Sequence, residues 1–169
     1  MNSRSERDEL AEAIGRVAIA ASYADVTVRT CVGVLGGAGA RLLADEQDSI
    51  SRLVDWCTSF RKRLYSPPDD TSQAFDVIAR RLKDKIQRRN TIIHGLWFSP
   101  SESVINVSNR KRGTGHYKMQ PFEIAAVKQL ASDITITADE FERACRLIAR
   151  LELLTPGRPP SGNDGSCRP

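Results

Sequence analysis

Three polar residues near the middle of the chain, Arg89, Asn90 and His94, could carry out chemistry together. A histidine side chain can take up or release a proton near neutral pH. An arginine presents a planar set of donors that matches a phosphate group and stabilises the negative charge that develops on it. An asparagine can orient the imidazole or a substrate hydroxyl. Such a set suits metal-independent cleavage of RNA, in which the ribose 2′-hydroxyl is the nucleophile.

The spacing of these residues places them on one side of a helix, which we predict to begin at a cap at Asp70 and to stop near Trp97 to Pro100. At 100° per residue, Arg89 falls within the apolar stripe of this helix. Asn90 and His94 are four residues apart and therefore stack on one adjacent face. Arg89 and His94 lie about 140° apart, a gap that the long arginine side chain can narrow. A charge in an apolar stripe is costly unless it is paired or faces a cleft.

Purely structural roles would also account for these residues. Arg89 could form an ordinary ion pair with Asp84 or Asp25 at the edge of the core. His94 could end the helix, with Gly95 as the residue that follows the C-cap. The residues alone leave these alternatives open beside the catalytic one.

Apolar residues that recur every three or four positions predict two helices before the motif. The first carries the stripe from Leu10 to Leu35 and stops at the glycine cluster of residues 36–39. The second covers about residues 46–64, with Asp45 as its N-cap, and ends before a serine–proline–proline sequence. Together with the motif-bearing helix, these elements predict a mainly helical protein.

A different pattern separates the third helix from the last one. Residues 104–107 and 116–119 flank a basic, glycine-containing turn at residues 109–115, which predicts a short β-hairpin. Pro121 then suits the first turn of a final helix, whose apolar stripe extends to Ile148. The predicted fold is therefore all-α: a bundle of four to five helices with a short β-hairpin inserted before the last helix.

The composition is that of a single soluble domain. The chain has 169 residues, of which 40% are hydrophobic and 27% charged, enough to bury one core. We expect this domain to cover residues 1–154, and residues 155–169, which lack large apolar side chains, to form a disordered tail. The net charge of +4 is compatible with a polyanionic partner but does not establish one.

The cysteines and the charge pattern favour the cytoplasm. The chain has four cysteines without a C-x-x-C pair and only two histidines, so we predict no metal site and no cofactor. Cys31, Cys57 and Cys145 lie on apolar helical faces, as buried reduced thiols do. The N-terminus mixes charges of both signs, unlike a signal peptide, and four charged residues interrupt the apolar stretch of residues 10–35, so we expect no membrane span.

Two further groups of residues have weaker functional interpretations. The basic turn Arg110–Arg112, with His116 and Tyr117, could line a path for RNA or could simply be a soluble turn. Trp56 and Trp97 are better explained as core or interface residues than as platforms on which bases stack.

The motif and the order of the elements resemble the HEPN superfamily (higher eukaryotes and prokaryotes nucleotide-binding domain). The run from Arg89 to His94 is similar to the R-x4-6-H motif of that family in its form with a four-residue spacer. Asn90 matches the polar residue that commonly follows the arginine, and an apolar pair precedes the histidine. Two long helices, the motif late in the third, a short β segment and a closing helix extend the resemblance over about residues 5–153.

The resemblance implies a HEPN-like bundle that forms a homodimer through the motif-bearing region, so that two Arg/His sets meet in one basic cleft. It implies a metal-independent endoribonuclease, a toxin or defence protein, with RNA as its substrate and with an antitoxin or regulatory protein as a further partner. His94 would be the acid–base residue, Arg89 the contact to the phosphate and the transition state, and Asn90 the supporting polar group.

One position departs from the family and speaks against one kind of antitoxin, and the family itself leaves one alternative function open. HEPN toxins that pair with nucleotidyltransferase antitoxins often carry a tyrosine two residues after the histidine, where this chain has Leu96. Some HEPN-like proteins are catalytically inactive. The alternative is therefore a helical interaction or regulatory module that binds a partner protein or a nucleic acid.

Overall fold

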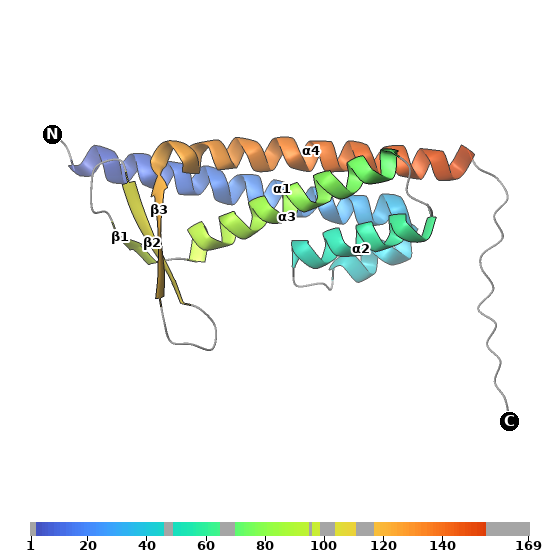
Figure 1. The fold of residues 1–169 in the computed structure, drawn as a ribbon, viewed down its shortest axis with the longest axis horizontal. Coiled ribbons are helices and arrows are strands. Elements are labelled where there is room, and N and C mark those ends of the chain that lie inside the picture. Colours follow the sequence, from blue (N-terminus) through green and yellow to red (C-terminus); the bar gives the residue numbers. More distant parts are fainter. Residues whose placement is uncertain are drawn as a thin grey trace, which may run out of the picture.

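A computed structural model of the chain shows, in the residues that it describes, four helices and beside them a small sheet of three strands (Figure 1). The helices are α1 (Ser3–Asp45), α2 (Ile50–Leu64), α3 (Asp70–His94) and α4 (Ile124–Leu154), and the strands are β1 (Leu96–Phe98), β2 (Val104–Arg110) and β3 (Tyr117–Glu123). The structure describes residues 3–45, 49–64, 70–94, 96–98, 104–110 and 117–154, and the side chains of residues 8–40, 44, 49–63, 70–94 and 121–151. The expected tail at residues 155–169 lies outside these ranges.

The two longest helices, α1 and α4, lie side by side along the molecule and run in the same direction (Figure 1). Near their starts, Lys128 Nζ lies 2.6 Å from Glu9 Oε1. Further along, the Tyr23 hydroxyl donates to Asp139 Oδ1 at 2.5 Å. Small buried residues on α1, among them Ala13, Ala20 and Ala24, let the two backbones approach closely.

The glycine cluster bends α1 instead of ending it, which corrects the prediction of a stop at residues 36–39. Gly37 has φ 75° and ψ −171°, so the helix breaks there and resumes in a new direction to Asp45. Gly36 lets Trp56 of α2 pack against α1, because a Cβ at this position would lie 2.6 Å from the tryptophan ring. The bend therefore allows α2 to pack against α1.

The second helix begins later than the sequence indicates. Asp45, the expected N-cap, is the last residue of α1, and α2 begins at Ile50. Ser49 caps it instead, since its Oγ accepts a hydrogen bond from Arg52 N at 3.3 Å. The C-terminal turn of α2 carries the basic residues 61–63, as the pattern predicts.

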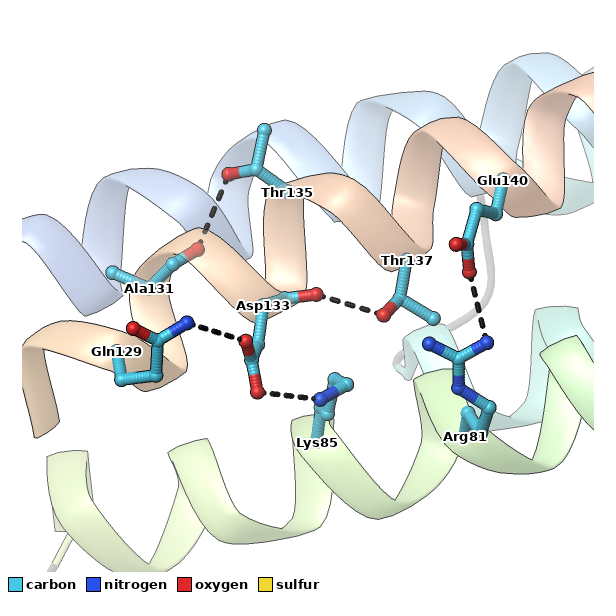
Figure 2. A network of polar contacts seen from close by, with 8 residues as sticks. All are labelled: Arg81, Lys85, Gln129, Ala131, Asp133, Thr135, Thr137 and Glu140. Carbon is cyan, nitrogen blue, oxygen red and sulfur yellow. Dashed lines mark hydrogen bonds and ion pairs between the residues drawn. The ribbon is translucent and has the colours of Figure 1, made fainter. Parts of the chain in front are cut away.

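A row of polar contacts fixes α3 along α4 (Figure 2). Asp133 accepts hydrogen bonds from Lys85 Nζ at 2.8 Å and from Gln129 Nε2 at 2.9 Å, and these two contacts hold the pKa of its carboxyl below the usual value. Closer to the N-terminus of α3, Arg81 Nη1 lies 3.1 Å from Glu140 Oε2 of α4. These contacts set where the C-terminal end of α3, which carries the motif, lies relative to the other helices.

The apolar core lies between the four helices. Phe75 of α3 packs against Phe141 of α4, with ring centroids 5.2 Å apart. The predicted burial of Cys31, Cys57 and Cys145 is confirmed, and all three are free thiols. Burial, together with contacts to the other two thiols, raises the pKa of Cys145 far above its usual value, so this group stays protonated and unreactive.

The sheet differs from the two short strands that the sequence predicts. α3 ends at His94 rather than near Trp97, and residues 96–98 form β1, which pairs antiparallel with β2. β2 and β3 are also antiparallel, and the expected turn at residues 109–115 falls largely outside the described residues.

The last helix also starts later than expected. Pro121 lies in β3, opposite Asn106 of β2, and α4 begins at Ile124. β3 is an edge strand, where a residue without an N–H group is tolerated.

One stretch of the described chain, Asp8–Ala40 in α1, is long and apolar enough to cross a membrane by length and composition alone. In the fold, 44% of the most apolar 18-residue segment of this stretch is buried. Because the core helix of a water-soluble protein passes the same test, this stretch is weak evidence for a membrane.

Candidate functional site

The described residues enclose a cleft of about 600 Å³ between α1, the N-terminal end of α2 and the C-terminal half of α3. All three residues of the predicted site, Arg89, Asn90 and His94, line it. The other lining residues come from all three helices and are Ala21, Ser22, Asp25, Val26, Ser49, Ile50, Ser51 and Ile86. A cleft of this volume is in the range that holds a small organic ligand or one nucleotide.

The buried face of α3 explains why a charged residue reaches this cleft. Phe75, Ala79, Leu82 and Ile86 follow one another along this face and fill the core. Arg89 takes the next place in the same series, where α1 and α2 leave a cleft instead of closing over α3. The charge in the apolar stripe therefore faces the cleft.

The guanidinium of Arg89 is half-buried, and part of it is without a partner. Its Nη1 donates to Asn90 Oδ1 at 2.9 Å, which holds the two side chains together. Its Nε is buried and makes no hydrogen bond in the described part of the chain. A buried donor without a partner is costly, so a ligand with an acceptor oxygen would be favoured here.

The structural alternative for Arg89 is an ion pair with a nearby carboxylate. Among the described residues, no carboxylate forms an ion pair with Arg89, neither Asp84 nor Asp25. Asp25 is paired with Arg29 instead. An ordinary edge ion pair therefore does not account for Arg89.

His94 is the last residue of α3, as the capping alternative requires, and its side chain is exposed. It also lines the cleft, so its position at the helix end and a role in the cleft are compatible. Gly95, the residue expected to end the helix, lies outside the described residues.

The α1 wall of the cleft contains a carboxylate that the sequence analysis considered only as an ion-pair partner. Asp25 Oδ2 accepts a hydrogen bond from Arg29 Nε at 2.9 Å. Arg29 also donates from Nη1 to the carbonyl oxygen of Ala44, in the part of α1 beyond the bend. Since Asp25 is 64 positions from Arg89 in the chain, no local spacing connects them, and only the packing of α1 on α3 does.

The third wall is the N-terminal end of α2, at Ser49, Ile50 and Ser51. The first N–H groups of a helix have no carbonyl partner within it and carry partial positive charge. The sequence missed this wall because it placed the start of the helix at residue 46. The cleft thus combines Arg89, His94 and a positive helix end with one carboxylate, a set that suits a ligand with both an anionic and a neutral polar part.

Other predicted functional residues have structural roles or cannot be placed. Trp56 stacks on Phe60 with ring centroids 5.2 Å apart and packs against Gly36, so it serves the contact between α1 and α2. The side chains of residues 110–112, 116 and 117 and of Trp97 lie outside those that the structure describes.

Within the parts of the chain that the structure describes, no three His, Cys, Asp or Glu side chains are grouped so that they could hold a metal ion. No protein-family model, curated protein or solved structure matches the chain. The chemistry of the cleft is therefore inferred from its own residues.

Proposed function

We propose that this chain is a metal-independent endoribonuclease of the HEPN type, with RNA bound in the cleft between α1, α2 and α3. The observation that carries the proposal is that Arg89, Asn90 and His94 line one cleft, with Arg89 free of any carboxylate partner among the described residues. A structural arginine at the edge of a core is expected to be paired, whereas one that binds a phosphate must be available to it.

In the proposed reaction, the 2′-oxygen of one ribose attacks the adjacent phosphorus. A new O2′–P bond forms while the bond from phosphorus to the 5′-oxygen of the next nucleotide breaks. His94 takes the proton of the 2′-hydroxyl, and a protonated histidine returns a proton to the leaving 5′-oxygen. The products are a 2′,3′-cyclic phosphate and a 5′-hydroxyl. Arg89 binds the phosphate and stabilises its developing charge, and Asn90 holds the guanidinium in place.

The proposed active form is a homodimer, which would supply His94 from each protomer to one composite cleft. A strip of exposed apolar side chains on α1, which we call the α1 strip, supports this: Ile19 is 73%, Tyr23 42% and Val26 63% exposed. The three residues lie on one face of the helix, and Val26 also lines the cleft. Covering this strip with a second copy would remove apolar surface from water beside the site.

The cellular setting belongs to the same proposal. We place the protein in the cytoplasm as a soluble toxin or defence protein, controlled by an antitoxin or another regulatory protein. The free, buried thiols of Cys31, Cys57 and Cys145 are compatible with a reducing compartment. Leu96, in place of the tyrosine that is modified in some toxins of this kind, argues against a nucleotidyltransferase antitoxin.

Cleavage of a labelled single-stranded RNA in the presence of EDTA tests the proposal. The wild-type protein should produce fragments that end in 2′,3′-cyclic phosphates, and His94→Ala should lower the rate by about 10²–10⁴-fold because the proton-transfer group is lost. Arg80→Ala is the matched control, because Arg80 is exposed on the same helix and does not line the cleft, so this variant should cleave like the wild type. Circular dichroism should show that all three proteins are folded.

Equal cleavage by the wild type and His94→Ala would show that the activity does not come from this site. Absence of cleavage by a folded wild-type dimer would favour the alternative, an inactive interaction module. Expression in bacteria adds an independent readout, since wild type should arrest growth and His94→Ala should not.

A further inference from the structure

We infer that Asp25 reads the base of the nucleotide in the cleft and selects guanine. The inference rests on the proposed function only for the identity of the ligand, a ribonucleotide. It concerns a residue that lies on α1, far in sequence from the Arg89–His94 motif, and that lines the same cleft as the motif.

Asp25 is held in place and stays accessible. The Arg29 guanidinium donates to Asp25 Oδ2 at 2.9 Å and is itself anchored to the carbonyl of Ala44 across the bend of α1. The Asp25 side chain is nevertheless 40% exposed and lines the cleft. A carboxylate with a fixed position and open acceptor sites can select among hydrogen-bond donors.

The charges in the cleft assign different parts of a ligand to Arg89 and to Asp25. Arg29 already compensates the charge of Asp25, and Asp25 does not pair with Arg89 although both line the same cleft. A phosphate is attracted by Arg89 and repelled by Asp25, so it belongs near the motif. The part of the ligand that reaches Asp25 must instead be neutral and must donate hydrogen bonds.

Guanine fits this requirement better than the other bases. Its Watson–Crick edge presents two adjacent donors, N1–H and the N2 amino group, to the two oxygens of a carboxylate. Adenine and cytosine present one amino group beside a ring nitrogen that is itself an acceptor, and uracil presents one N–H between two carbonyl oxygens. A carboxylate therefore meets two donors only on guanine, and single-stranded RNA leaves this edge free to be read.

Measurements of nucleotide binding test the selection of guanine by Asp25 without any need for catalysis. Isothermal titration of the full-length protein with guanosine 3′-monophosphate and adenosine 3′-monophosphate should show tighter binding of the guanine nucleotide, by about tenfold. Asp25→Asn should reduce this ratio to near one, because the amide nitrogen presents donors to the donors of guanine. Glu12→Gln is the matched control: Glu12 lies on the same helix, pairs with Arg16 four residues on and does not line the cleft, so the ratio should stay as in the wild type.

Cleavage gives a second test with DNA oligonucleotides that contain a single ribonucleotide, since only that position has a 2′-hydroxyl. In the wild type, kcat/KM for riboguanosine should exceed that for the other three ribonucleotides by about tenfold, and Asp25→Asn should remove this preference.

The outcomes separate this inference from the proposed function. Cleavage at all four ribonucleotides alike, or a base preference that Asp25→Asn leaves unchanged, overturns the role of Asp25 and leaves the ribonuclease standing. A uniform fall in kcat for all four would assign Asp25 to the positioning of catalytic groups, which also overturns base selection. Guanine-selective binding that depends on Asp25, in a protein that cleaves no RNA, would support the inference and overturn the proposed reaction.

Discussion

Arg89 and Arg61 both extend from helices into apolar surroundings, but their partners differ. Arg61 is 2% exposed and forms an ion pair with Asp76, which joins α2 to α3. Arg89 contacts only a neutral amide, and both arginines keep a buried Nε without a partner among the described residues, so the difference between them is the carboxylate. An ion pair that is already formed belongs to the architecture, whereas a half-buried guanidinium that lines a cleft without a carboxylate partner is better explained by ligand binding.

The two arginines should therefore respond differently to replacement by methionine, which keeps the apolar stem. Arg89→Met should leave the free energy of unfolding unchanged or slightly higher, while RNA cleavage falls by about 10²–10³-fold because the phosphate contact is lost. Arg61→Met should lower the free energy of unfolding by about 2–3 kcal/mol, since it leaves the partly buried Asp76 without its partner. Urea denaturation and cleavage assays on both variants check this. A destabilised Arg89→Met protein would indicate a structural role for Arg89.

At the level of elements, the site depends on the bend in α1. A straight α1 could not carry Ala44 back to the Arg29 side chain that holds Asp25. The bend also leaves room for α2 to pack on α1, with Trp56 against Gly36, and so to bring its N-terminal end to the cleft. Two adjacent glycines thus serve separate purposes: Gly37 has the positive φ, and Gly36 has the close contact.

Gly36→Ala tests the close contact. The added Cβ would lie 2.5 Å from Ala40 Cβ and 2.6 Å from the Trp56 ring, so the helices must move apart, and we expect a loss of about 1–3 kcal/mol in the free energy of unfolding. Gly15→Ala in the same helix is the control, since nothing lies within 4 Å of a Cβ there and alanine is the better helix former, which predicts a gain of about 0.5–1 kcal/mol. Urea denaturation measures both. Equal effects from the two substitutions would mean that α2 does not pack on α1 through this contact.

At the level of the whole molecule, the cleft lies beside a surface that a single chain leaves uncovered. The α1 strip of Ile19, Tyr23 and Val26 is continuous with the cleft through Val26. One chain supplies one Arg89 and one His94, whereas the proposed reaction uses one histidine to take a proton and a protonated one to return it. A dimer formed on the α1 strip would cover this apolar surface and would also supply the second histidine.

Ile19→Glu tests this assembly without altering a residue of the cleft. The charge should weaken dimerisation by about 100-fold, so that light scattering at micromolar concentration reports the mass of one chain, and RNA cleavage should fall in parallel. Val77→Glu is the matched control, because Val77 is also exposed but lies about 180° around α3 from the cleft residue Ile86. If Ile19→Glu keeps the mass and activity of the wild type, the α1 strip is not the interface.

Features that depend on residues close together in the chain could be predicted from the sequence. The periodicity predicted four helical segments in an all-α fold, the burial of Cys31, Cys57 and Cys145, and the position of Arg89 in the stripe of α3. Element boundaries were less predictable where a distant partner decides them. Pro121 is in a strand because β3 pairs with β2, and α1 continues beyond Gly37 because its returning segment can pack on the fold.

The surroundings of the Arg89 side chain depend on how the helices pack against one another. The same stripe could have been covered by another helix or paired with Asp25, and the residues gave no means of choosing between these outcomes. The packing of α1 and α2 on α3 leaves a cleft at that point and brings Asp25 and the N-terminal end of α2 to its walls. These contacts join residues tens of positions apart, so they depend on how whole helices pack and not on the local spacing that a sequence displays.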